Sequence, residues 1–251
     1  NKSGNDYVAW CWKGGGDDVL NEVGDIDSQV SANTAAGFSI VKYSGSDGTK
    51  TVGHGLDNPP EMIIIKNTTS GSSWRVYNST IGNTKALELN GSSNEFSFVG
   101  WNNTSPTSTL FTARGSSSDG TWVNRTGNDY IAYCFHSVPG YSKIGTYTGN
   151  GSSTGPIVYT TDDGTSGGSN GFEPKFIMIK RTDTSGYGWY MMDSARGMDG
   201  TTGKFLFANT SASEGTLGAG GLQPNSTGFQ ITDAGAGFNA ILGTYIYLAF
   251  A

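Results

Sequence analysis

The fold is decided by the stretch Gly127–Phe135, whose sequence GNDYIAYCF is a glycine-led turn that feeds an aromatic strand. The same pattern occurs at residues 4–12 as GNDYVAWCW and at residues 243–251 as GTYIYLAFA. Aromatic and β-branched residues are enriched in strands, and a leading glycine supplies the turn. Three copies of one strand predict a chain that is built from repeats of a single unit.

Further blocks recur in the same order in the two halves of the chain. The sharpest is Pro60–Lys66 (PEMIIIK), which matches Pro174–Lys180 (PKFIMIK) at an offset of 174 − 60 = 114 residues. The other matched pairs are Gly37–Gly45 with Gly140–Gly149, Trp74 with Trp189, and Lys85–Asn90 with Lys204–Asn209. Solenoid repeats are typically about 20–50 residues long, so this period indicates tandem domains that each have a core.

The repeats divide the chain into three parts. Residues 1–35 are predicted to contain the closing strand of a preceding repeat and a glycine-rich linker at Gly14–Asp18. Residues 36–136 are predicted to form a first complete repeat, and residues 137–251 a second. Inside each repeat the apolar runs are short and separated by Gly, Ser, Asn and Thr clusters. This pattern is typical of antiparallel sandwiches. We therefore expect an all-β fold of tandem β-sandwiches, jelly-roll or lectin-like, with few and short helices.

The first copy of the strand, Tyr7–Trp12, should close a repeat other than the two complete ones. For this reason we expect that Asn1 is not the native start of the protein. The apolar side chains of an unpaired aromatic strand need cover. We expect this strand to dock on the first complete repeat or to pair with a neighbouring subunit.

Composition narrows the classes of function. Glycine supplies 39 of 251 residues, charged residues 14% and aromatic residues 12%, which favours strands over helices. The formal net charge is 15 − 21 = −6 and the basic residues form no cluster, so nucleic acid is not an expected partner. The longest apolar run, Tyr245–Ala251, is far shorter than the about 20 residues that cross a bilayer, so no membrane insertion is expected.

The two cysteines and two histidines are expected to be structural. Cys11 and Cys134 occupy equivalent places in two copies of the strand, where the third copy, aligned on Tyr247–Phe250, has Ala251. Equivalent places lie a domain apart, beyond the about 4.4–6.8 Å between Cα atoms that a disulfide needs, so both thiols are predicted to be free and buried. His54 and His136 have no neighbouring His or Cys to form a metal site or a nucleophile pair.

No arrangement of carboxylates indicates an enzyme or a cofactor site. A glycosidase needs two carboxylates across a cleft, and Glu88 and Glu95 only flank one turn. The loops Asp25–Asp27 and Asp162–Thr165 could offer oxygen ligands to Ca²⁺, but neither matches an EF-hand, and solvated acidic turns explain them better. We expect no catalytic residues, no metal ligands and no cofactor.

Aromatic rings interleaved with amides are the remaining candidates for a binding site. An aromatic face packs on the C–H groups of a sugar while amides bind its hydroxyls, so such loops suit carbohydrate. The candidate carbohydrate-binding residues are Trp101, Asn102, Asn103, Trp122, Asn124 and Tyr187. The alternative is that these rings cap the sandwich cores, as we expect for Trp189 because it has a counterpart in Trp74.

The chain resembles a family of marine, cyanophage-like bacteriophage virion proteins, in which lectin-like sandwich domains are strung together in tail fibres. The resemblance rests on the repeated aromatic strands, including the closing Gly243–Ala251, and on three further motifs: Thr51–Leu56 before Pro59-Pro60, Trp101–Ser108 and Gly149–Ser152. It implies a structural protein of a fibre or spike on the virion surface. Host recognition through cell-surface polysaccharide would be its further role, and other virion subunits its partners, as a homo-oligomer.

Two alternatives remain open at this stage. The first is a head fibre or capsid decoration protein without glycan binding. The second is a polysaccharide-degrading enzyme, for which the sequence offers no constellation.

Overall fold

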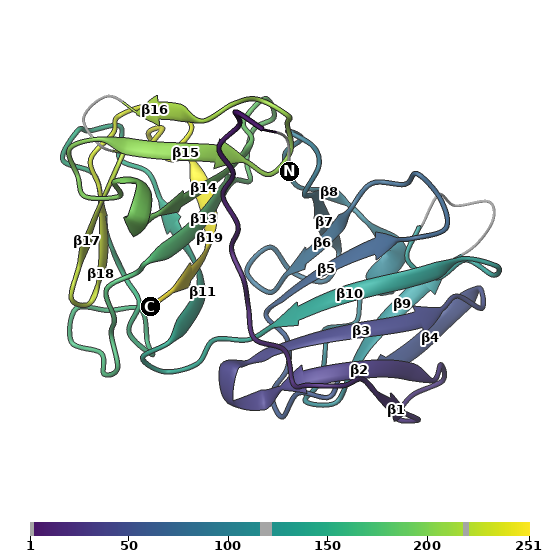
Figure 1. The fold of residues 1–251 in the computed structure, drawn as a ribbon. Coiled ribbons are helices and arrows are strands. Elements are labelled where there is room, and N and C mark those ends of the chain that lie inside the picture. The colour runs from purple at the N-terminus through teal and green to yellow at the C-terminus, as the bar shows by residue number, and fades with distance from the viewer. Residues whose placement is uncertain (1–2, 116–121, 218–220) are drawn as a thin grey trace.

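The computed structural model describes residues 3–115, 122–217 and 221–251, and its regular structure is almost entirely β (Figure 1). The helices of this part of the chain are three-residue 3-10 turns, η1 (Thr34–Ala36), η2 (Val99–Trp101) and η3 (Ser194–Arg196). The predicted all-β fold with short helices is confirmed. None of the described residues forms a helix that is long and apolar enough to span a membrane.

The strands of the first sandwich are β1 (Val19–Asn21), β2 (Ser28–Asn33), β3 (Phe38–Ser44), β4 (Gly48–Gly53), β5 (Met62–Asn67), β6 (Arg75–Asn78), β7 (Lys85–Glu88), β8 (Phe96–Ser97), β9 (Leu110–Gly115) and β10 (Asp129–Phe135). Its large sheet has the order β1-β2-β3-β10-β5-β6-β7-β8, and β4 pairs with β9 in a second sheet. All the pairs are antiparallel.

The strands of the second sandwich are β11 (Ser142–Thr148), β12 (Ile157–Tyr159), β13 (Phe176–Arg181), β14 (Trp189–Asp193), β15 (Gly203–Phe207), β16 (Gly215–Leu217), β17 (Leu222–Asn225), β18 (Gly228–Ile231) and β19 (Thr244–Phe250). Its large sheet has the order β11-β19-β13-β14-β15-β16, and β12-β18-β17 forms the second sheet. The orders β3-β10-β5-β6-β7-β8 and β11-β19-β13-β14-β15-β16 therefore match strand for strand.

The register of the strands confirms the repeat residue by residue. Ile64 of β5 faces Tyr133 and Val76, and Met178 of β13 faces Leu248 and Met191, so Ile64 and Met178 lie on equivalent strands at equivalent places. The same register corrects the predicted alignment of the closing strands. Cys134 faces Ile63, and Ala249 faces Ile177, so Ala249 and not Ala251 stands in the place of Cys134. The alternation of strand faces hid this two-residue shift because it leaves every side chain on the same face.

Each closing strand lies between two other strands of its large sheet and contributes to two apolar clusters. Tyr130, Ala132 and Cys134 point into the core of the first sandwich, and alternate residues of β10 point to the opposite face of the sheet. β19 does the same in the second sandwich with Tyr245, Tyr247 and Ala249.

The outer faces of the two large sheets meet in a third apolar cluster, which we call the seam. It contains residues from both sandwiches, among them Phe38, Met62, Phe135, Ile144, Phe176, Met178, Trp189, Leu248 and Phe250. Polar contacts reinforce it: the indole N–H of Trp189 donates to the carbonyl oxygen of Glu88 at 2.8 Å, and the backbone N–H of Glu95 donates to Thr182 at 2.9 Å. The seam packs the two sandwiches against each other through their sheets.

The predicted boundary at residue 36 is wrong, because β1 and β2 belong to the first sandwich. Both extend its large sheet beyond β3, and Val30 lies in its core. The predicted linker also packs along β2. Gly15 donates its N–H to Ser31 Oγ at 3.0 Å, and a Cβ at Gly15 would lie 1.9 Å from the carbonyl oxygen of Ala32. A side chain cannot fit there, so glycine is required for close approach rather than for flexibility.

Residues 5–12, which we call the leading segment, form no strand in the structure, although Tyr7–Trp12 was predicted to be one. In Figure 1 the dark purple chain of this segment runs between the two sandwiches. Trp10 and Trp12 pack against the seam, where Trp12 contacts Phe135 of the first sandwich and Phe250 of the second. The segment thus docks on both sandwiches rather than on the first alone.

Candidate functional site

The structure places two of the predicted carbohydrate-binding residues in the core, where no ligand can reach them. Trp101 is 2% exposed, packs edge-on against Tyr77, and donates its indole N–H to the carbonyl oxygen of Lys85 at 2.9 Å. Asn124 is fully buried, and its side chain ties together the turn at Asp47-Gly48 and strand β9. For Trp101 and Asn124 the prediction of a binding role is therefore wrong, and the alternative of a structural role is correct.

The other four predicted residues lie at the surface without forming one site. Asn102 and Asn103 are exposed in a turn with positive φ angles of 51° and 52°, where asparagine is tolerated better than most residues. Trp122 is half-buried under the guanidinium of Arg125, at 5.4 Å. Tyr187 belongs to the second sandwich and lies beneath Arg181 at 4.9 Å. The structure brings no sugar-sized cluster of rings together from this set.

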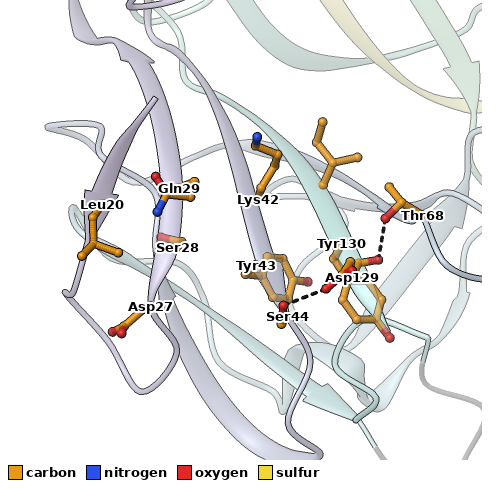
Figure 2. Close-up of a pocket in the computed structure, with 11 residues that line it drawn as sticks. Leu20, Asp27, Ser28, Gln29, Lys42, Tyr43, Ser44, Thr68, Asp129 and Tyr130 are labelled. Atoms are coloured by element: carbon orange, nitrogen blue, oxygen red, sulfur yellow. Dashed lines mark hydrogen bonds between the residues drawn. The ribbon is translucent and has the colours of Figure 1, made fainter. Parts of the chain in front are cut away.

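A groove on the outer face of the first large sheet is the better candidate site (Figure 2). It has a volume of about 410 Å³ and lies where β1, β2, β3 and β10 run side by side beyond the seam. We call it the sheet groove and define it by the residues that line it, which are Leu20, Asp27, Ser28, Gln29, Lys42, Tyr43, Ser44, Thr68, Asp129, Tyr130 and Ile131.

Strand register explains why polar side chains gather in the groove. Leu20 faces Gln29, Gln29 faces Lys42, and Lys42 faces Ile131, so one row of side chains crosses four strands on the solvent face. Neighbours in such a row have Cβ atoms about 4.5–5.5 Å apart. The row places an amide and an ammonium group between two apolar side chains, which is the combination that a sugar ring can use on its polar and apolar faces.

Hydrogen bonds fix the carboxylate of Asp129 at one end of the groove. Ser44 Oγ donates to Asp129 Oδ1 at 2.7 Å, and Thr69 Oγ1 accepts the backbone N–H of Asp129 at 2.9 Å. Thr68 Oγ1 donates to the backbone carbonyl of Asp129 at 3.0 Å, as Figure 2 shows. The second carboxylate oxygen of Asp129 has no protein partner among the described residues, so it can accept a hydrogen bond from a ligand hydroxyl.

The positive charge of the groove belongs to Lys42, which forms an exposed ion pair. Lys42 Nζ lies 3.0 Å from Asp18 Oδ2, and both side chains are about half exposed. The hydrogen bond and the positive charge of Lys42 lower the pKa of the Asp18 carboxyl. Exposed ion pairs of this kind contribute little to stability. Lys42 can therefore turn toward a bound ligand at small cost.

His54 is held by hydrogen bonds to the backbone of Leu56 and Thr107. His54 is fully buried, accepts the backbone N–H of Leu56 on Nδ1 at 3.1 Å, and places Nε2 3.1 Å from the carbonyl oxygen of Thr107. Burial lowers the pKa of His54, and the contact with Thr107 opposes this shift. In the neutral form the ring acts as a donor and an acceptor within one loop.

The two thiols behave differently. Cys134 is free and buried, and burial raises its pKa to about 12. Cys11 is also free but exposed, so the prediction of a buried thiol is wrong for Cys11.

One carboxylate in each of the two loops that were considered for calcium already accepts hydrogen bonds from protein donors. Asp25 Oδ2 accepts from the backbone N–H and the hydroxyl of Thr51, and Asp163 Oδ1 accepts from the same two groups of Thr165. These hydrogen bonds lower the pKa values of both carboxyls. Within the described part of the chain, no three His, Cys, Asp or Glu side chains are grouped so that they could hold a metal ion.

Sequence reasoning missed the sheet groove because its residues come from four separate strands. The usable signal was the alternation in Val41-Lys42-Tyr43-Ser44, where polar residues mark the solvent face. That signal shows which face is exposed, but it does not show that β1 and β2 extend the sheet to one side.

One comparison with known proteins gave a match. A family model described as a domain of unknown function (DUF7483) matches residues 1–251. Neither the curated proteins nor the solved structures gave a match.

Proposed function

The chain belongs to the DUF7483 family, a domain of unknown function, and we propose that it is a non-catalytic module of a bacteriophage fibre or spike that recognises host saccharide through the sheet groove. The observation that carries the recognition role is that Gln29 and Lys42, from one row of side chains, and the nearby Asp129 line one groove on an open sheet face. Glycan sites need hydrogen-bonding groups that are held in place, and here the sheet register holds them.

The structural half of the proposal rests on the seam. Two sandwiches joined by a flexible linker would move independently, whereas these two share an apolar cluster and inter-sandwich hydrogen bonds. A stiff pair of sandwiches suits a fibre, which must hold its recognition surface away from the particle. The sheet groove lies on the first sandwich where the seam does not cover the outer face, so stiffness and recognition use different parts of the same sheet.

The recognition role is tested by binding of the purified chain to host cells and to a glycan array. We expect Lys42→Ala and Asp129→Asn each to weaken binding about 10-fold or more, the effect of losing one hydrogen bond to a charged group. Lys50→Ala is the matched control, because Lys50 lies on β4 in the other sheet. Binding that all three substitutions leave unchanged would place the site outside the sheet groove.

The structural role is tested separately, by locating the chain in phage particles with an antibody raised against it. Labelling of a fibre or spike is the expected result. Labelling spread over the capsid would favour a decoration protein, and release of reducing ends from host polysaccharide by the purified chain would favour an enzyme.

A further inference from the structure

The leading segment has the sequence of a closing strand but only half of that strand's environment. Its residues Tyr7, Ala9 and Cys11 match Tyr130, Ala132 and Cys134, which line the core of the first sandwich, and all three pairs are identical. Gly4, which precedes the segment, has a φ of 84°, and its counterpart Gly127 has 77°. The turn before the strand is thus formed as it is before β10.

The two faces of the leading segment differ sharply in what covers them. Trp10 and Trp12, on the face equivalent to the outer face of β10, pack against the seam. Ala9 and Cys11, on the face equivalent to the core face of β10, are exposed, whereas Cys134 is fully buried. The segment therefore makes the seam contacts of a closing strand and lacks the core contacts.

Three equivalent side chains meet where the closing strands and the leading segment come together. Trp12, Phe135 and Phe250 hold the same position in the three copies, as the register of β10 and β19 establishes for the last two. Their ring centroids are 6.4 Å (Trp12 to Phe135), 5.5 Å (Trp12 to Phe250) and 6.3 Å (Phe135 to Phe250) apart. The three equivalent rings are thus in mutual contact, as residues beside a pseudo-threefold axis would be.

A second pair of equivalent residues shows that one interface around this axis is unfilled. Trp189 of the second sandwich is 1% exposed and donates its indole N–H to the carbonyl oxygen of Glu88 of the first. Its counterpart Trp74 is only half-buried, and its indole N–H has no partner among the residues that the structure describes. Trp74 lines an apolar hollow of about 380 Å³ beside Trp12. Trp74 lacks the acceptor that a third sandwich would supply from its own position equivalent to Glu88.

We propose that this chain binds a third sandwich of the same repeat, in which the leading segment is the central strand and the Trp12–Phe135–Phe250 triangle is the shared axis. The occupant must have strands equivalent to β3 and β5 that are open to receive the segment on both edges. A second copy of this chain does not qualify, because β10 and β19 already fill that place in both of its sandwiches. This inference is independent of the sheet groove and of saccharide binding.

The test supplies the third sandwich by extending the full chain. A copy of residues 13–126, which is the first sandwich without its closing strand, is joined directly before Gly4, so that residues 7–12 can complete it. The copy contains no cysteine, so Cys11 and Cys134 remain the only thiols. We expect Cys11 to react with a thiol reagent about 100-fold or more slowly in the extended chain than in the 251-residue chain, because core positions open only rarely.

Ala9→Asp provides the matched control. Ala9 is exposed in the 251-residue chain, so this substitution should leave its melting temperature and tryptophan fluorescence unchanged. In the extended chain the same substitution places a carboxylate in the new core and should restore the reactivity of Cys11. The proposal is overturned if Cys11 reacts equally fast in both chains, or if protease removes the added copy while residues 4–251 remain intact.

Discussion

The two sandwiches share one strand order, yet equivalent residues have different environments. Lys66 on β5 is partly exposed and donates to the carbonyl oxygen of Ser72 at 2.6 Å, whereas Lys180 on β13 is fully buried and donates to Arg181 at 2.7 Å. Trp74 and Trp189 differ in the same way. The repeat determines the backbone and the inner face of each sheet. The position of a residue relative to the seam determines how far its side chain is buried on the outer face.

The largest expected difference between equivalent substitutions is at the two tryptophans. Trp189→Ala should lower the free energy of unfolding by about 3–5 kcal/mol, because it empties a buried site and leaves Glu88 without its donor. Trp74→Ala should cost about 1–2 kcal/mol, since its ring is half-buried and stacks mainly on Tyr133. Denaturant titration of both variants measures this difference. Equal losses would show that the seam is not the source of the asymmetry.

The repeat itself was predictable from the sequence because it is carried by inner-face residues and turns. The match of Pro60–Lys66 with Pro174–Lys180 located equivalent strands correctly, since both are central strands whose sequence is set by burial. The seam was not predictable in the same way. Met62–Ile65 is a continuous apolar run, and such a run shows that both faces are buried without showing what covers the second face.

The candidate site was not predictable from the sequence, for a related reason. Rings and amides in loops, such as Trp101 and Asn124, suggested a surface, but the core and the turns of the sandwich use the same residue types. Composition cannot separate the two uses. The sheet groove depends on β1 and β2 joining the sheet, which is a pairing between distant segments that a local sequence pattern does not encode.

Alanine substitution of two buried asparagines, one in each sandwich, should lower the stability by similar amounts. Asn124 and Asn239 are both fully buried, and each receives a backbone N–H on its side-chain oxygen, from Ser46 at 2.9 Å and from Asn150 at 2.7 Å. Asn124→Ala and Asn239→Ala should each lower the free energy of unfolding by about 2–3 kcal/mol, because they leave buried donors and acceptors without hydrogen-bond partners. Thermal unfolding measures both, and a difference well above 1 kcal/mol would mean that the inner faces are not equivalent.

Lys180 on β13 predicts a pH dependence of the stability of the chain. Burial lowers the pKa of Lys180 from 10.5 to about 8. Between these values the unfolded chain binds more protons at this site than the folded chain, so the contribution of Lys180 to stability rises with pH. At pH 7 the folded chain carries the full cost of the buried charge.

Lys180→Met should therefore stabilise the chain at pH 7 by roughly 1–3 kcal/mol, and the gain should shrink as pH rises from about 8 toward 10.5. Lys66→Met is the matched control, because Lys66 holds the equivalent place on β5 and is partly exposed. The measurement is denaturant unfolding of each variant against the parent at several pH values. A gain that is constant across this range would show that Lys180 is accommodated in its charged form.

The smallest expected effect is a difference in thiol reactivity between Cys11 of the leading segment and Cys134 of β10. Cys11 and Cys134 are equivalent in sequence, but only Cys134 has a core around it, and burial raises its pKa to about 12. At pH 8 the native 251-residue chain should therefore react with one equivalent of a thiol reagent, and denaturation without reductant should reveal the second. Cys11→Ser should remove the fast equivalent and leave stability unchanged, since the side chain is exposed. Two fast equivalents in the native chain would mean that β10 opens readily, and the central strand of the first sandwich would then lack the stability that its position in the sheet implies.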